Sequence, residues 1–153
     1  MARAPGAEDV LRGPHVLEYP YRRSLGPVLG RFFDELRRRR LVGIRTRDGR
    51  VLVPPQEYDP DTGEALDEIV PVGPAGEIVS FAWVSRPRAK QPLPHPFAFA
   101  LIRLDGADTS LLHAVDAGDE SKLAPGVRVV PRFAEAPAGG IRDIVCFDLE
   151  GAA

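Results

Sequence analysis

Cysteine is almost absent from this chain of 153 residues, in which Cys146 stands alone. A lone thiol cannot form an internal disulfide, so we expect a domain held by an ordinary hydrophobic core and compatible with reducing conditions. Cys146 lies in the apolar run IVCFDL. In such a run we interpret it as a small buried hydrophobic residue rather than a nucleophile.

Long apolar runs and a charge bias are also missing. No run approaches the roughly 20 residues needed to cross a bilayer, and the N-terminal sequence MARAPGAEDVLRG lacks the apolar core of a signal peptide. We therefore expect a cytoplasmic protein without membrane contact. The 20 basic and 22 acidic residues give a formal charge of −2, which provides no general attraction for nucleic acid.

Motifs for catalysis are absent as well. The sequence has no G-x-S-x-G elbow, no H-E-x-x-H pair, and neither Walker nor dinucleotide glycine motifs. Of three widely spaced histidines, His113 in the strand-like run LLHAV is predicted to be structural, whereas His95 between prolines is the better candidate for a functional contact. Asp105 and Asp108 are typical of turn chemistry. The sequence thus predicts no self-contained active site.

The first part of the chain divides into an arm and a helix. Residues 1–23 are predicted to form a mobile arm followed by an extended aromatic strap around Pro20. Residues 24–42 are predicted to form an amphipathic helix, with Ser24 as N-cap, Pro27 in the first turn and apolar residues at intervals of three and four. Four arginines at 37–40 favour the negative end of the helix dipole, and Gly43 ends the helix.

Residues 43–72 are predicted to form a ribbon of two facing turns. Asp48-Gly49 indicates a two-residue type I′ hairpin, and Pro54-Pro55 separates it from a second tight turn at 59–63. Such a ribbon normally carries Cys-x-x-Cys in each turn, because tetrahedral zinc prefers thiolate and imidazole ligands. Here the ligand positions hold Thr46, Asp48, Asp59 and Thr62. These side chains suit zinc poorly, so we predict a metal-free, degenerate ribbon.

Residues 73–153 follow a Gly-Pro corner and contain five strand-like runs, which predict a small closed barrel of the OB type. The expected fold is therefore mainly β with an N-terminal helix, a degenerate zinc-ribbon-like hairpin and a five-stranded OB-fold barrel. A proline-rich connection, SRPRAKQPLPHP, projects between the first two strands. It concentrates basic residues and is a candidate for phosphate or partner contact, or a solvated loop stiffened by proline.

The order of these segments resembles a known family. The amphipathic helix is followed by LVGIRT-RDGRVLVPPQEYDPDTG, then by GEIVSFAWV, the proline-rich loop, PFAFALIRLDGADTSLLHAV and LAPGVRVVPRF. This order is similar to the domain of unknown function 35 family, which has a rubredoxin-like ribbon followed by an OB fold. The resemblance covers about residues 25–149. The family's four zinc cysteines are replaced here, and one residue is missing between the first two positions.

The resemblance implies a non-catalytic accessory subunit of a thiolase-superfamily enzyme, either a lipid-transfer-protein-type thiolase or a side-chain-cleaving aldolase. It further implies a role in lipid or sterol side-chain breakdown, a two-plus-two assembly, and association in some relatives with a MaoC-type hydratase. Acyl-CoA is then a substrate of the complex, and this chain itself binds no cofactor and no zinc. Candidate contacts with CoA or the partner are Arg86, Arg88, Lys90, His95 and Phe97. Candidate docking residues on the helix and ribbon are Phe32, Phe33, Leu36, Pro54, Pro55 and Tyr58.

A second hypothesis is a single-stranded nucleic-acid binder, because OB barrels bind oligonucleotides through aromatic platforms. Phe81, Trp83, Phe97 and Phe99 are the candidate stacking residues. The acidic balance and the lack of basic residues between these aromatics argue against it. A third hypothesis, a small hydratase or hydrolase, has no set of residues to support it.

Overall fold

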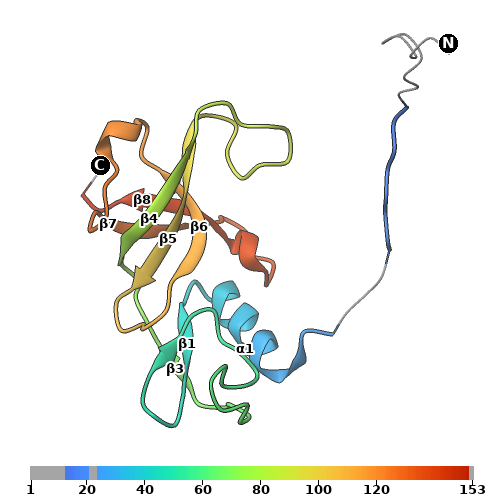
Figure 1. Cartoon of the computed structure of the whole chain (residues 1–153), viewed down its shortest axis with the longest axis vertical. Coiled ribbons are helices and arrows are strands. Elements are labelled where there is room, and N and C mark those ends of the chain that lie inside the picture. The colour runs from blue at the N-terminus through green and yellow to red at the C-terminus, as the bar shows by residue number, and fades with distance from the viewer. Residues whose placement is uncertain (1–12, 21–23, 152–153) are drawn as a thin grey trace, which may run out of the picture.

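The computed structural model describes residues 13–20 and 24–151. The predicted mobile arm and residues 21–23 of the predicted strap thus lie outside the described residues, apart from Gly13. Residues 13–20 contain no helix or strand. Val16, Leu17 and Tyr19 are exposed there. The body of the protein consists of a helix and a small sheet beside a barrel (Figure 1).

Helix α1 (Gly26–Arg37) begins later and ends earlier than predicted, and Ser24 does not cap it. The predicted stop at Gly43 is wrong, because Arg39 already has a positive φ and Gly43 lies in a strand. Leu25 is the N-cap residue, without a side-chain hydrogen bond, while Pro27 lies in the first turn as expected. Gly26 has a φ of +74°, and a Cβ at this position would collide with the carboxylate of Glu57. The Glu57 carboxylate thus lies against the start of the helix, where negative charge is favourable. No described helix is long and apolar enough to cross a membrane.

The four arginines at 37–40, at the end of α1, form ion pairs or hydrogen bonds with other residues of the chain. Arg38 and Arg40 form ion pairs with Glu35. Arg37 donates a hydrogen bond to the carbonyl of Ala138, and Arg39 donates to carbonyls at 134 and 135. Two of the arginines therefore attach the end of the helix to a segment that is about a hundred residues later in the sequence.

The ribbon is a three-stranded antiparallel sheet of β1 (Val42–Arg45), β2 (Val51–Leu52) and β3 (Ile69–Pro71), in the order β2-β1-β3. The predicted type I′ turn is wrong. Gly49 has positive φ but Asp48 does not, and Gly49 N donates to Thr46 O while Thr46 N donates to Arg50 O. This is a three-residue hairpin loop with glycine in its left-handed position. The second turn is confirmed, since Gly63 N donates to Asp59 O.

The five remaining strands form the predicted barrel. They are β4 (Gly76–Val84), β5 (Phe97–Leu104), β6 (Leu111–Asp116), β7 (Arg128–Phe133) and β8 (Ile144–Leu149). Their order is β4-β5-β6-β8-β7, and pairing of β4 with β7 closes the barrel. All neighbours are antiparallel except β6 and β8, which run parallel. The mainly β architecture with an N-terminal helix and an OB-fold barrel is thus confirmed.

The ribbon is attached to the barrel through the free edge of β2. Val51 N donates to the carboxylate of Asp108, and Val51 O accepts from Asp108 N. Val53 exchanges two hydrogen bonds with the hydroxyl of Thr109, which accepts from its N–H and donates to its carbonyl. Asp108, which was predicted only to form a turn, therefore also binds the backbone of β2. In this way the segment after β5 covers the edge of the ribbon.

One hydrophobic core runs through the helix, the ribbon and the barrel. Phe32 and Leu36 of α1 are fully buried in a cluster with Val53 of the ribbon and with Ile102 and Val129 of the barrel. Burial of apolar surface is the main favourable term in folding. The three parts therefore stabilise one another through a shared core.

We expect Leu36→Ala to lower the free energy of unfolding by about 3 kcal/mol, because it leaves a cavity in this core. Leu25→Ala makes the same chemical change at a side chain that is 47% exposed, and should cost less than about 1 kcal/mol. Urea unfolding of both variants measures the difference. Equal losses would show that the face of α1 is not a core element.

Candidate functional site

The proline-rich connection between β4 and β5 folds back over the outside of the barrel. Leu93 is buried with Phe97, Ala114 and Cys146 in a small apolar cluster of its own. A turn at 88–91 is closed by Gln91, whose side-chain oxygen accepts from Arg88 N. The connection is thus an anchored loop, and Phe97, with 0% exposure, packs beneath it instead of presenting a surface contact.

His95 anchors the end of this loop through Asp116 at the end of β6. The Nε2 atom of His95 lies 3.1 Å from Asp116 Oδ2, and Arg132 Nη2 on β7 donates to the same oxygen at 2.8 Å. Partial burial raises the pKa of Asp116, but hydrogen bonds from Arg132 and His95 outweigh it, so this pKa lies below its usual range. The carboxylate remains charged and holds both side chains.

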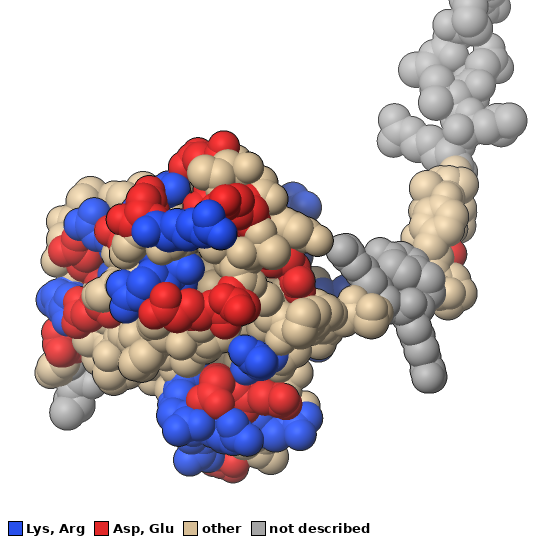
Figure 2. Space-filling model, turned by 90° about the horizontal axis from the view of Figure 1, so that it is seen from below, with Lys and Arg blue, Asp and Glu red and all other residues tan. Residues whose placement is uncertain are grey.

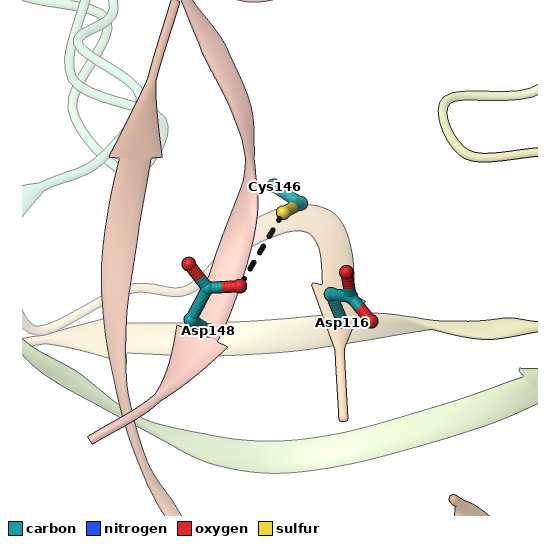
Figure 3. A group of neighbouring side chains, drawn as sticks. All are labelled: Asp116, Cys146 and Asp148. Atoms are coloured by element: carbon teal, nitrogen blue, oxygen red, sulfur yellow. Dashed lines mark hydrogen bonds between the residues drawn. The ribbon is translucent and has the colours of Figure 1, made fainter. Parts of the chain in front are cut away.

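Asp116, Cys146 and Asp148 form a group of side chains with metal-ligating atoms within 4.8 Å of one another (Figure 3). Their chemistry does not fit a metal ion. Burial raises the pKa of the Cys146 thiol to about 11, so the thiol is protonated at neutral pH. Arg132 donates to the sulfur, with its Nη2 and Nε atoms 2.7 and 3.2 Å away, and already supplies the positive charge of the group. The interpretation of Cys146 as a buried hydrophobic residue is confirmed.

A cavity of about 660 Å³ opens beneath the loop, between its turn and the end of the barrel. Lys90 lies on the loop side, and Ile141 and Arg142 lie on the short 3-10 helix η3 (Ile141–Asp143). The remaining lining residues are Gln91, Pro92, His113, Ile144 and Val145. A smaller hollow of about 320 Å³ adjoins the loop and includes Arg88 and Lys90. Basic and apolar side chains therefore line the same cavity.

Asp143 shapes the segment that carries Ile141 and Arg142. Its buried carboxylate accepts hydrogen bonds from the backbone N–H groups of residues 138, 139 and 140, at 2.8, 2.8 and 3.2 Å. Burial acts to raise the pKa of Asp143, but these bonds and the nearby Arg37 keep it below its ordinary value. This segment has no signal in the sequence, since a short irregular turn has no periodicity.

His113 lies on β6 at the wall of the cavity. Its ring packs edge-on against Phe147 with centroids 5.6 Å apart, and its Nδ1 atom is buried without a hydrogen-bond partner in the described structure. Burial lowers the pKa of His113, so the ring is neutral at pH 7. The packing of His113 against Phe147 agrees with the structural role predicted for it. His113 also lines the cavity, which the sequence did not indicate.

The predicted contact residues do not all lie together. Lys90 borders the cavity and Arg88 the adjoining hollow, whereas Arg86 is exposed on the loop outside both linings. Among the described residues, none of these three cations forms an ion pair within the chain. His95 is engaged with Asp116, as described above. The residues that sequence reasoning missed are Arg142 and Ile141, because nothing in the sequence places them opposite Lys90.

The predicted docking residues divide into buried and exposed ones. Phe32 and Leu36 belong to the core, Phe33 is half-buried against it, and Pro55 is buried. Pro54 and Tyr58 are exposed, Tyr58 to 62%. Docking through this part of the chain, which stays a prediction, is therefore limited to Pro54, Tyr58 and the outer surface of the helix.

The four aromatic residues of the nucleic-acid hypothesis do not form one platform. Phe81 and Trp83 pack against the main core, whereas Phe97 and Phe99 lie in the cluster outside the barrel, with ring centroids 4.9 Å apart. Their side chains thus occupy opposite sides of the barrel wall. Acidic and basic side chains also alternate on the face seen in Figure 2. Neither feature favours a stacking groove for single strands.

The four positions that correspond to zinc ligands lie in the two facing turns of the ribbon. Thr46 and Asp59 are buried, whereas Asp48 and Thr62 are exposed. Hydroxyl and carboxylate groups already hydrogen-bonded within these turns do not fit the soft, tetrahedral ligand set of structural zinc.

Comparison with known families gives one match. A family described as "ChsH2, C-terminal OB-fold domain" matches residues 69–134. This segment includes β3 to β7 and stops before β8. No curated protein matches the chain.

Two solved structures show the same fold. One is a protein of the DUF35 family from Sulfolobus solfataricus, with 21% identity over 69% of this chain and 78% of the other, and a TM-score of 0.56. The other is described as the Ltp2-ChsH2(DUF35) aldolase, with 22% identity over 84% of this chain and 98% of the other, and a TM-score of 0.61. Together with the family match, these similarities confirm the resemblance to the domain of unknown function 35 family.

We expect native Cys146 to react at least about a hundredfold more slowly with iodoacetamide at pH 8 than in the unfolded chain. Its pKa of about 11, against an ordinary 9.0, reduces the thiolate fraction by about that factor, and burial slows the reaction further. The native rate should rise about tenfold for each pH unit up to that pKa. Mass spectrometry follows alkylation, and the urea-unfolded chain is the control. Equal rates in the two states would contradict a buried, protonated thiol.

Proposed function

We propose, from the match of residues 69–134 to the ChsH2 C-terminal OB-fold domain, that the chain is a non-catalytic accessory subunit of a thiolase-superfamily acyl-CoA enzyme. The observation that carries the proposal is the likeness of fold to a chain of the Ltp2-ChsH2 aldolase, which extends over 84% of this chain and 98% of the other. The matched part is long enough to include more than the barrel. The chemistry of the complex then resides in the partner, a thiolase or an aldolase.

The cavity beneath the loop supports a role in binding acyl-CoA. Lys90 and Arg142 provide positive charge at its rim, and Ile141, Ile144 and Pro92 provide an apolar wall. A CoA thioester combines phosphates, which cationic donors bind, with an acyl chain, which apolar surface binds. Arg86 and Arg88 extend the positive charge along the loop. We therefore propose that this part of the barrel borders the entrance to the partner's acyl-CoA site.

Tyr58 and Pro54 on the ribbon, with the outer surface of α1, are the proposed docking residues. An exposed tyrosine is typical of interface centres, because it buries a large area with little loss of conformational entropy. The proposal includes a two-plus-two assembly, a function in lipid or sterol side-chain breakdown, and association with a MaoC-type hydratase in a larger complex.

Co-expression with a thiolase-like protein encoded beside this chain tests the assembly. We expect the two proteins to co-elute in size exclusion, and the pair, but not this chain alone, to convert acyl-CoA. Tyr58→Ala should weaken the complex about tenfold or more, as truncation of an interface anchor does. Val79→Ala is the control, since Val79 is also exposed but lies on the barrel strand β4. A chain that stays unbound in every such pairing contradicts the proposal.

Lys90 and Lys122 provide a matched test of the acyl-CoA contact in the assembled pair. Both are exposed lysines, but Lys90 borders the cavity and Lys122 lies on the 3-10 helix η2 (Glu120–Lys122). We expect Lys90→Gln to raise the KM for acyl-CoA about fivefold with little change in kcat, because a charge-assisted hydrogen bond to a phosphate is lost. Lys122→Gln should leave KM unchanged. Identical KM values for the two variants would exclude the cavity as a CoA contact while leaving the assembly in place.

A further inference from the structure

The two turns of the ribbon hold a cation of their own, the guanidinium of Arg50, beside the four positions that correspond to zinc ligands in a zinc ribbon. We infer that the guanidinium of Arg50 links the two turns in place of the metal, so that the ribbon keeps its shape without zinc. This inference concerns the stability of the ribbon and is independent of the proposed function. It rests on contacts made by a single side chain with carboxylates from both turns.

In the first turn, Arg50 is bound to Asp48. Its Nε atom donates to Asp48 Oδ2 at 2.7 Å. The hydroxyl of Thr46 donates to the other oxygen of the same carboxylate and lies 3.1 Å from Arg50 O. Thr46 is only 3% exposed. Two of the four ligand positions are thus used to orient one carboxylate toward the guanidinium.

In the second turn, Arg50 contacts two carboxylates. Its Nη2 atom lies 2.7 Å from Asp61 Oδ2 and 3.8 Å from Asp59 Oδ1. Asp59 is 5% exposed, and its Oδ1 atom also accepts from the N–H groups of Asp61 and Thr62, at 2.8 and 3.3 Å. Asp59 therefore stabilises the second turn from within while Arg50 connects that turn to the first.

Arginine suits this position for a geometric reason. Its guanidinium is planar, remains charged at all ordinary pH values and has five donors that diverge toward several acceptors. One side chain can therefore bind carboxylates on two sides, which a lysine ammonium does less well. The hydrogen bonds from Thr46 and Arg50 hold the pKa of Asp48 below its usual range, so Asp48 remains charged at neutral pH.

The guanidinium also excludes the metal. Zinc would have to enter beside a fixed positive charge and bind oxygen atoms that already have donors. A second ion pair, between Arg47 and Glu64 at 2.8 Å, also joins the turns, but the arginine in it is 81% exposed and water screens it. Arg50, at 37% exposure, is the better shielded of the two links.

Arg50→Gln and Arg45→Gln form a matched pair. Both arginines lie in the ribbon, are similarly exposed at 37% and 41%, and have carboxylate partners, but Arg45 pairs with Glu68 outside the two turns. We expect hydrogen exchange of residues 57–66 to become about tenfold faster in Arg50→Gln and to change less than twofold in Arg45→Gln, because Arg50, unlike Arg45, ties the second turn to the first. Arg50→Lys should restore part of the protection. EDTA should leave the wild-type melting temperature unchanged, and elemental analysis should find no zinc.

Two results would overturn the inference. One is equal exchange of residues 57–66 in the Gln variants at positions 50 and 45. The other is one zinc per chain in the purified protein, together with a lower melting temperature after EDTA. Should Arg50→Gln fail to fold, Asp61→Asn and Glu68→Gln repeat the comparison from the acidic side, at side chains that are 65% and 60% exposed. Equal exchange in those two variants would also overturn it.

Discussion

The hydrogen bonds between the edge of β2 and the segment after β5 are the constraint on which the rest of the structure depends. Through Asp108 and Thr109, the barrel satisfies the N–H and carbonyl groups of Val51 and Val53. A two-residue strand has too few backbone partners to stay in place alone, and an unpaired edge is a liability. Once the edge is paired, the side chains of the ribbon and of α1 enter the core of the barrel. Helix, ribbon and barrel then behave as one unit.

Arginine recurs as the residue that joins distant segments. Arg37 and Arg39 join the end of α1 to residues 134–138, Arg50 joins the two turns of the ribbon, and Arg132 joins β6 to β8 through Asp116 and Asp148. Individual exposed pairs contribute little to stability. Their common effect is to fix geometry, because a planar, permanently charged group binds acceptors in set directions.

Basic side chains that are already paired within the chain are less available to a ligand, and this bears on where the candidate site lies. Within residues 24–151, most of the basic side chains are engaged with neighbouring carboxylates or carbonyls, and charges of both signs alternate on the face in Figure 2. Among the described residues, the loop cations Arg86, Arg88 and Lys90 belong to the basic side chains that form no ion pair, and they lie together on one segment. Beside them lie Arg142 and the apolar wall of the cavity. A surface of this kind fits a contribution to a partner's binding site better than catalysis by this chain.

The local residue pattern was sufficient to predict the helix and the strands of this architecture. Apolar spacing of three and four indicated α1, and β-branched and aromatic runs between Gly, Pro and Asp indicated the five barrel strands. The lone Cys146 and the unsuitable ligands of the ribbon also followed from residue chemistry. These features could be predicted because periodicity, turn residues and ligand preference act over a few neighbouring positions.

Only the tertiary structure decided how these parts are used. It placed Phe32 and Leu36 in the core, anchored the loop through Leu93 and His95, and brought Arg142 opposite Lys90. It also moved the helix start past Ser24, where Glu57 lies against Gly26, and gave the first turn a three-residue loop. Each of these outcomes depends on contacts between residues far apart in the chain. The sequence by itself determined which elements form, whereas packing decided which side chains remain free to bind.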